Sequence, residues 1–181
     1  MKSMMAPMLV AALLACTGVA HAASLVVNGD FATDDLTGWT LSGDQTATGV
    51  TGQVFFAGPF LAPGELSQSL ATGGTGPFTI SFDLYETGDA PGDFFRASFG
   101  GQQVLGIQHV GLQPTRYTFT VDGTGATTLL AFDYFNVLDF YFLDNVSVSP
   151  AGVVPEPASP LLLLAGIGLL GLVGARRRST R

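Results

Sequence analysis

The chain has 181 residues, one cysteine, 14 acidic residues and seven lysines and arginines, which give a formal net charge of −7 at pH 7. A single cysteine excludes an intrachain disulfide, so stability has to come from a hydrophobic core or from a bound metal. Residues 23–153 carry 13 acidic residues against Arg96 and Arg116, a charge of −11, which excludes nucleic acid as a partner because phosphates bind clustered basic residues.

The N-terminus has the pattern of an export signal. Lys2 precedes an apolar stretch from Met4 to Ala15, and Ala20-His21-Ala22 is a small-residue cleavage sequence. We therefore expect a signal peptide over residues 1–22, cut after its last residue. The stretch Leu13-Leu14-Ala15-Cys16 resembles a lipobox, in which the cysteine is lipidated and becomes the new N-terminus, so this alternative stays open.

The pattern of residues 23–150 predicts an all-β domain. Short apolar runs are separated by Gly, Pro, Asp or Thr, and none of them has convincing helical periodicity. In Phe78–Leu84 and Tyr117–Val121, apolar and polar side chains alternate, as they do on the two faces of a sheet. Gly100-Gly101 fits a two-residue hairpin turn. Nine or ten strands fit an antiparallel two-layer sandwich. The expected strands are Leu25–Val27, Trp39–Leu41, Gln53–Ala57, Leu66–Leu70, Phe78–Tyr85, Phe94–Phe99, Gln102–Leu105, Tyr117–Val121, Thr128–Tyr134 and Phe140–Val148.

Motifs in this domain resemble the galactose-binding-like jelly roll, which carbohydrate-binding modules and many exosortase substrates share. They are Val27–Phe31 with the following Gly38-Trp39, then Leu66–Leu70, and finally Phe142–Val148. The resemblance covers most of residues 24–149, and it is the order of the motifs that carries it. It implies a jelly-roll β-sandwich in which the first and last strands lie close together, with Trp39 packed inside.

A structural calcium is the one cofactor that this resemblance implies. Many members hold calcium near the opening and closing motifs, so Asp144 would be a ligand, with Asp30 and the backbone oxygens around Asn28 beside it. Members often place a glutamate after the phenylalanine of the opening motif, where this chain has Ala32, so one carboxylate is missing. The alternative is that Asp144 and Asn145 satisfy backbone groups at a strand edge.

Catalytic groups are scarce, so no catalytic residue is assigned. Residues 23–153 contain one histidine, His109, which we expect in a loop, and no nucleophile elbow, zinc-binding helix pair or phosphate-binding loop. A glycosidase-type carboxylate pair remains as an alternative. We expect residues 86–93 to form a solvated hairpin loop rather than a calcium loop. The candidate carboxylates are Asp83, Glu86, Asp133 and Asp139.

Recognition of a sugar would need exposed aromatic side chains beside polar groups. Neighbouring residues in a strand point to opposite faces, so some members of each adjacent aromatic pair have to leave the core. They either form a ligand-binding patch or pack under loops, and the sequence does not name the ligand. The candidates are Phe55, Phe56, Phe60, Tyr85, Phe94, Phe95, Tyr134, Phe135, Phe140 and Tyr141.

The C-terminal residues have the order of a membrane-sorting tail. A linker over 151–157 ends in Pro155-Glu156-Pro157, and 18 uncharged residues follow at 158–175. As a helix they would cover about 27 Å, which nearly spans a hydrocarbon core about 30 Å thick. Arg176, Arg177 and Arg178 then favour a cytoplasmic end. We expect a single transmembrane sorting helix at 158–175 and a basic cytoplasmic tail at 176–181.

This tail resembles the PEP-CTERM signal of Gram-negative envelope proteins, in which the motif, the helix and the basic cluster are read by an exosortase. The resemblance implies an exported protein that passes from the inner membrane to the outer surface or the exterior after processing. Its implied partners are the exosortase and the membrane. We expect a non-enzymatic structural or adhesion role. The alternatives are a carbohydrate-binding module that recognises extracellular polysaccharide and a glycan-cleaving enzyme.

Overall fold

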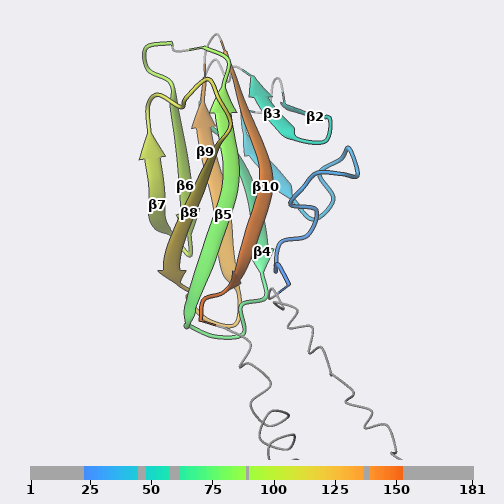
Figure 1. Ribbon diagram of the computed structural model, residues 1–181, viewed down its shortest axis with the longest axis vertical. Helices are drawn as coiled ribbons and strands as arrows, with labels where there is room; N and C mark the ends of the chain where they lie inside the picture. The colour runs from blue at the N-terminus through green and yellow to red at the C-terminus, as the bar shows by residue number, and fades with distance from the viewer. Residues whose placement is uncertain (1–22, 45–47, 58–61, 89, 137–138, 153–181) are drawn as a thin grey trace, which may run out of the picture. The chain divides into compact units, whose positions relative to one another are not determined.

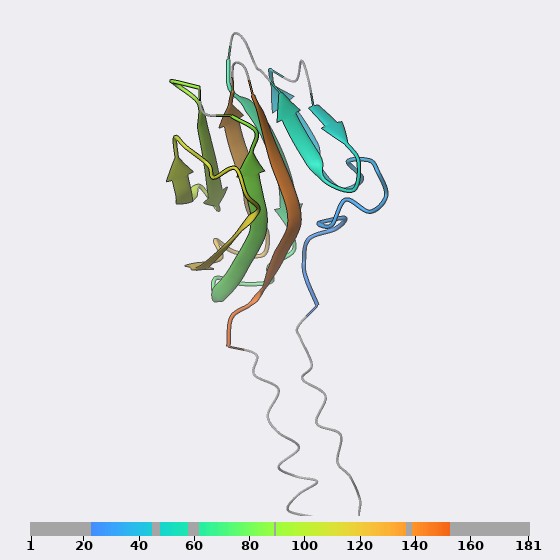
Figure 2. The ribbon, with the colours of Figure 1, turned by 45° about the horizontal axis from the view of Figure 1, so that its top comes forward.

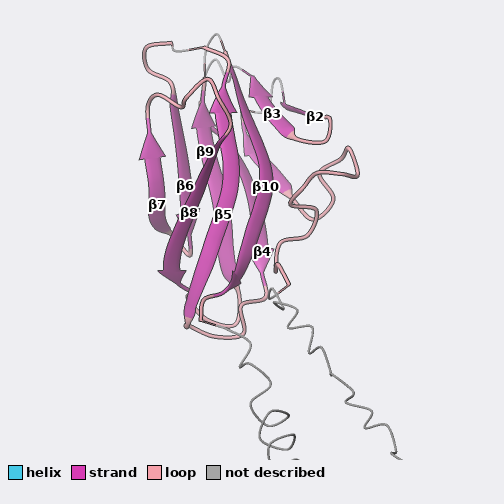
Figure 3. Cartoon of the chain, viewed as in Figure 1, coloured by secondary structure: helices cyan, strands magenta, loops and turns pink. Residues whose placement is uncertain are grey.

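The computed structural model describes residues 23–44, 48–57, 62–88, 90–136 and 139–152. These residues form ten strands and no helix, as Figure 3 shows, so the predicted all-β fold is confirmed. The strands are β1 (Thr40–Gly43), β2 (Thr48–Val50), β3 (Val54–Ala57), β4 (Gly64–Leu70), β5 (Pro77–Glu86), β6 (Phe94–Phe99), β7 (Gln102–Ile107), β8 (Thr115–Asp122), β9 (Thr128–Phe135) and β10 (Phe140–Pro150).

The strands form two five-stranded antiparallel sheets. Sheet I has the order β1-β4-β9-β6-β7, and sheet II has the order β2-β3-β10-β5-β8. Figure 1 shows sheet II in front of sheet I, and Figure 2 shows the same two layers from another angle. Most neighbours within a sheet are distant in the sequence, as in β4-β9-β6, so the chain passes repeatedly between the layers. This is the predicted jelly-roll sandwich.

The core consists of the inward side chains of both sheets. In β5, Phe78, Ile80, Phe82 and Leu84 are buried, and the residues between them are half-buried on the outer side. The ring of Phe82 contacts Phe132 of sheet I, with ring centroids 5.2 Å apart. Burial of each such ring contributes about 2 kcal/mol. The alternation predicted for residues 78–84 is therefore confirmed.

Trp39 lies in the core, as the sequence predicts. Its side chain is 8% exposed and packs against Phe31 and Phe132, with ring centroids 5.6 and 6.1 Å apart. Its indole Nε1 donates a hydrogen bond of 3.0 Å to the backbone oxygen of Asn28. This hydrogen bond pairs the one polar atom of the indole, and it holds the loop that contains Asn28, which we call the opening loop, against the sandwich.

The strand predicted at Leu25–Val27 is wrong, because side chains take the place of a neighbouring strand there. The carboxamide of Gln68 accepts a hydrogen bond from the Val27 N–H at 2.8 Å and donates one to the Val27 oxygen at 3.0 Å. The Ser24 hydroxyl accepts from the N–H groups of Val26 and Val148. The segment is extended and well bonded, but it has no continuous ladder of backbone partners.

The hairpin β6–β7 was predicted from the sequence, whereas the hairpin β2–β3 was not. The predicted turn at Gly100-Gly101 is confirmed, because both residues have positive φ, 58° and 81°, as a hairpin turn requires. The strand Thr48–Val50 was not predicted, since Thr-Gly-Val lacks an apolar alternation. It forms by pairing with β3, across a turn that contains Gly52 at φ 63°.

A β-bulge in β10 brings the two ends of the domain together. Residues 140–143 of β10 pair with β3, the register shifts between Asp144 and Ser147, and the strand then bonds to the N-terminal segment. Val146 donates its N–H to the Gly29 oxygen at 2.8 Å, and Leu25 donates to the Val148 oxygen at 2.7 Å. The predicted proximity of the opening and closing motifs is therefore confirmed. We call these contacts the N-terminal seam.

Several predicted features lie outside the described residues. They are the signal peptide with Cys16 and its cleavage residues Ala20 and Ala22, the aromatic candidate Phe60, and the tail with Pro155, Glu156, Pro157, the helix at 158–175 and Arg176, Arg177 and Arg178. Within the part of the chain that the structure describes, none of the residues forms a helix with the length and apolarity that a membrane crossing requires.

The close approach in the N-terminal seam predicts a steric requirement at Gly29. A Cβ at this position would overlap the Val146 carbonyl oxygen, so we expect Gly29→Ala to lower the free energy of unfolding by about 1–3 kcal/mol. Urea denaturation followed by tryptophan fluorescence measures the change. The matched control is Gly76→Ala, because a Cβ there meets no atom within 4 Å. Equal stability of the two variants would contradict the steric argument.

Candidate functional site

An aromatic pair stands on the outer face of sheet I. Phe94 of β6 and Phe135 of β9 are opposite each other in the strand register, with ring centroids 5.9 Å apart and planes inclined by 17°. The guanidinium carbon of Arg96 lies 4.2 Å from the centre of the Phe94 ring. This cation–π contact fixes an exposed charge beside two half-buried rings. The result is an apolar surface with a hydrogen-bond donor at its edge.

A charged row crosses the same face next to the aromatic pair. Arg96 is opposite Asp133, Asp133 is opposite Glu65, and Glu65 is opposite Ser42 in the strand register. Burial raises the pKa of Asp133, the negative charge of Glu65 raises it further, and Arg96 opposes both effects. The Ser42 hydroxyl donates a hydrogen bond of 3.5 Å to Glu65 Oε1. Each carboxylate has several lone pairs, so Asp133 and Glu65 have capacity to accept further hydrogen bonds from a ligand.

Small side chains form the next row of sheet I. Thr40, Ser67, Ala131 and Ser98 follow one another in register across β1, β4, β9 and β6. Ser67 and Ala131 are only 6% and 4% exposed although they alternate with inward residues. The row therefore brings no long side chain to the face beside the charged row, and its central residues are buried. We call Phe94, Phe135, Arg96, Asp133, Glu65 and the small row the sheet I surface.

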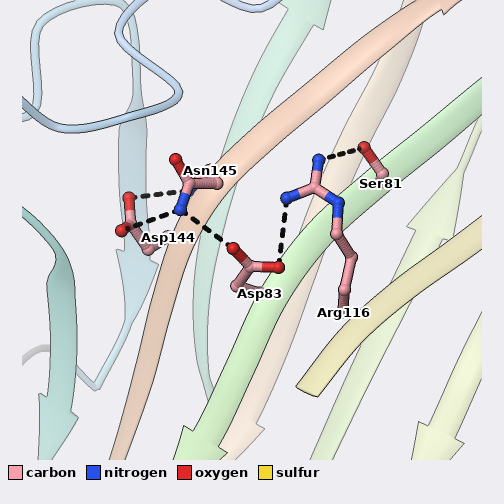
Figure 4. Close-up of polar contacts among 5 residues, drawn as sticks. All are labelled: Ser81, Asp83, Arg116, Asp144 and Asn145. Atoms are coloured by element: carbon pink, nitrogen blue, oxygen red, sulfur yellow. Dashed lines mark hydrogen bonds and ion pairs between the residues drawn. The ribbon is translucent and has the colours of Figure 1, made fainter. Parts of the chain in front are cut away.

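The outer face of sheet II carries a polar network, which Figure 4 shows. Arg116 of β8 donates to Asp83 Oδ1 at 3.1 Å and to the Ser81 hydroxyl at 2.8 Å. The Asn145 amide donates to Asp83 Oδ2 at 2.9 Å and to Asp144 Oδ2 at 3.1 Å. Three strands of sheet II are thereby joined by side chains beside the bulge of β10.

Asp30 and Asp144, the residues implied for calcium, belong to the two segments joined at the N-terminal seam and are close enough for their charges to interact. Burial raises the pKa of Asp144, the hydrogen bond from the Asn145 N–H lowers it, and the charges of Asp83 and Asp30 raise it. The opening loop, the bulge and Arg116 line a cavity of about 400 Å³ here. Asn28 Oδ1 is buried and accepts no hydrogen bond from the described residues.

The oxygens at this site are of the type that a hard cation binds, but the side chains supply fewer of them than calcium needs. An orphan amide oxygen and two carboxylates are the donors that calcium prefers. Within the described residues, however, no three side chains of Asp, Glu, His or Cys come together, so a calcium here would depend on amide and backbone oxygens in addition to Asp30 and Asp144.

The structure divides the aromatic candidates between the core and the two outer faces. Phe56, Phe95, Tyr134 and Tyr141 are at most 1% exposed and belong to the core. Phe94 and Phe135 lie outside on sheet I, whereas Phe55, Tyr85 and Phe140 lie outside on sheet II. As predicted, each adjacent pair within a strand sends one ring in and one ring out.

The four candidate glycosidase acids do not gather at one site. Asp83 and Asp133 lie on different sheets. Asp139, just before β10, lies against Gly88 near the end of β5, where Glu86 is 2% exposed on the inner side of the strand. The expectation of a solvated hairpin loop at 86–93 is wrong, because β5 and β6 belong to different sheets and Asp93, like Glu86, is buried, with 1% exposure. His109 is exposed between β7 and β8, as predicted.

Sequence reasoning missed Arg96, Glu65 and Phe142. Phe142 was visible in principle, since it is two residues from Phe140 in one strand and therefore shares its face. Arg96 and Glu65 were not visible, because they meet Asp133 only through the register of β4 and β6 with β9.

Comparisons with known proteins identify the tail and the fold. The model of the PEP-CTERM protein-sorting motif matches residues 153–178. No curated protein matches the sequence. Among solved structures, the domain is similar to TmCBM61, solved with beta-1,4-galactotriose, at a TM-score of 0.58 and 17% identity over 70% of this chain and 98% of the other.

Two further structures have the same fold. The CBM22-1 xylan-binding domain of Paenibacillus barcinonensis Xyn10C has a TM-score of 0.53 and 16% identity over 72% of this chain and 97% of the other. The enzymatically active domain of tailspike protein 4 of bacteriophage CBA120 has a TM-score of 0.52 and 15% identity over 70% of this chain and 21% of the other.

At these sequence identities the solved structures establish the fold alone. The match at residues 153–178 is a sequence match, and it identifies the sorting motif. The PEP-CTERM motif implies export and handling at the cell envelope by an exosortase. The chain therefore carries a PEP-CTERM protein-sorting motif behind a jelly-roll domain of the type found in carbohydrate-binding modules.

Proposed function

We propose that this protein is sorted to the cell surface or exterior and binds a neutral extracellular polysaccharide through the sheet I surface. The observation that carries the proposal is the register of that surface, which sets an aromatic pair beside a charged row on a jelly-roll sandwich. A structural or adhesion role then follows from binding, because a protein that holds matrix polysaccharide becomes part of the matrix.

The chemistry of the sheet I surface matches a sugar chain. The apolar C–H face of a pyranose packs against the rings of Phe94 and Phe135, while its hydroxyls donate to Asp133 and Glu65 and accept from Arg96. Hydrogen bonds to charged groups contribute about 1.5–3 kcal/mol each when well formed. The charge of −11 over residues 23–153 disfavours an anionic polysaccharide.

We propose that the protein binds without cleaving. Glycoside hydrolysis in its usual form needs two carboxyl groups on either side of one bond, about 5–9.5 Å apart. Asp83 and Asp133 lie on different sheets, and Glu86, the candidate acid nearest to Asp139 in the fold, is buried inside the sandwich. Asp133 and Glu65 are neighbours, but they are side by side in one row of a sheet face. Release of reducing sugar from any bound polysaccharide would contradict this part of the proposal.

Replacement of either ring tests the binding surface. We expect Phe94→Ala and Phe135→Ala each to weaken binding about two- to tenfold, because each removes a stacking partner contributing about 0.5–1.5 kcal/mol. Isothermal titration with the polysaccharide extracted from the producing cells, and with neutral β-linked galactan and xylan, measures the affinity. Leu112→Ala, at a residue 61% exposed between β7 and β8, is the control. The absence of glycan binding by the unmodified protein would refute the proposed function.

The route to the surface is also a proposal, and the mature termini test it. We expect mass spectrometry of the exported protein to find Ala23 at the N-terminus and no Arg181 at the other end. A lipid-modified Cys16 at the N-terminus would establish the lipobox alternative instead. Alanine at Pro155, Glu156 and Pro157 should leave the tail uncut, whereas Thr180→Ala should not. Intact Arg181 throughout the exported wild-type protein would exclude processing.

We propose a structural calcium at Asp30 and Asp144, with Asn28 Oδ1 as a neutral ligand. When bound, the ion would neutralise carboxylates that repel one another and stabilise the folded state in proportion to its occupancy. A chelator should lower the thermal midpoint by several degrees. Asp144→Asn should remove that response, while Asp122→Asn, an exposed residue at the end of β8, should retain it. An unchanged wild-type midpoint after chelation argues against the ion.

A further inference from the structure

A second aromatic strip crosses the outer face of sheet II. Phe55 of β3, Phe142 of β10 and Tyr85 of β5 are opposite one another in the strand register. The rings of Phe142 and Tyr85 stack with centroids 4.6 Å apart and planes inclined by 7°, and Phe55 lies 6.2 Å from Phe142. Phe140, 40% exposed, contacts both phenylalanines at its end of the strip. None of these rings belongs to the buried core.

The strip continues onto the edge strand and is held in place by a polar contact. A Cβ at Gly49 of β2 would overlap the ring of Phe55, so this ring lies against the β2 backbone. The Gln53 amide and the Tyr85 hydroxyl are in hydrogen-bonding contact at 3.3–3.4 Å. The aromatic groups are therefore positioned by four strands and by Gln53 in the turn between β2 and β3.

Hydrogen-bonding side chains extend the strip along the strands. The network of Asp83, Arg116 and Asn145 comes next, and hydroxyl side chains follow in two rows across β10, β5 and β8. One row consists of Ser147, Ser81 and Thr118, and the other of Ser149, Thr79 and Thr120. We call the rings, the network and these hydroxyls the sheet II surface. It combines stacking and hydrogen-bonding groups, as the sheet I surface does, on the opposite side of the sandwich.

We propose that the sheet II surface is a second binding site for neutral polysaccharide, so that one domain holds two polysaccharide chains and cross-links them. This inference rests on the proposed function and supplies the physical basis of a matrix role. The two surfaces belong to different layers of the sandwich, so a chain bound at one does not occupy the other.

The charge of this face selects the occupant. Asp83 and Asp144 lie on the sheet II surface against one arginine, and Asp30 adjoins it. A second copy of this acidic domain would bring the same carboxylates against them, and anionic lipid headgroups would also be repelled. A neutral sugar chain carries no charge, and its hydroxyls match the donors and acceptors of the surface.

Two binding sites on one domain would allow it to cross-link polysaccharide chains, which can be measured separately from the affinity of either site. Binding of two segments of a polysaccharide network by one protein raises avidity and joins separate chains, whereas a single site only coats them. The proposed cross-linking therefore predicts both a stoichiometry and a mechanical effect.

The test uses the purified protein with neutral polysaccharide extracted from the producing cells and with oligosaccharides made from it. Titration should find two oligosaccharide sites in the wild type. We expect Phe142→Ala to weaken one of them about two- to tenfold, Phe94→Ala to weaken the other to a similar extent, and the double variant to weaken both. The viscosity of the polysaccharide solution should rise with wild type and with the Leu112→Ala control, and should rise less with either single variant. Arg116→Ala, at an exposed side chain, should weaken the sheet II site without disturbing the core.

The outcomes separate the two proposals. One site in the wild type, weakened by Phe94→Ala and unaffected by Phe142→Ala and Arg116→Ala, overturns the second surface and leaves the first intact. No binding by the wild type overturns the proposed function itself. A wild-type dimer that Phe142→Ala converts to a monomer in sedimentation would show that another copy occupies the sheet II surface, which also overturns the inference.

Discussion

The backbone contact between Gly29 and Val146 is the constraint on which the rest of the domain depends. Because no side chain intervenes, the opening loop can bond directly to the second half of β10. The same contact places Asn28 and Asp30 beside the bulge that carries Asp144. Closure of the sandwich and assembly of the candidate calcium ligands are thus two results of one steric fact.

The two outer faces follow from the alternation of side chains in strands. Because adjacent aromatic residues cannot both point inward, each such pair contributes one ring to the core and one ring to an outer face. In β6, Phe95 is buried and Phe94 is outside; in β10, Tyr141 is buried and Phe142 is outside. A sandwich built from such strands has aromatic groups on both sides, and the registers of β9 and β10 gather them into the surfaces to which we assign polysaccharide.

Much of the fold and part of the candidate site could be predicted from the sequence, and the limits have physical causes. Strands in which apolar and polar residues alternate, such as Phe78–Leu84, can be predicted from the sequence alone. The tail can also be predicted, because its motif is a continuous stretch of sequence. Leu25–Val27 has strand composition but bonds to the side chain of Gln68, a partner 41 residues away. The charged row needs the register of three strands distant in sequence, and no local pattern encodes it.

The bulge in β10 has a consequence for how the N-terminus is handled. Beyond residue 143 the strand no longer has β3 beside it, and the segment from Ser24 to Gly29 shields that edge instead. Trimming the chain past Ser24 would expose unpaired amide and carbonyl groups, which invite strand addition from another molecule. The segment from Ser24 to Gly29 therefore protects the domain against self-association through this edge.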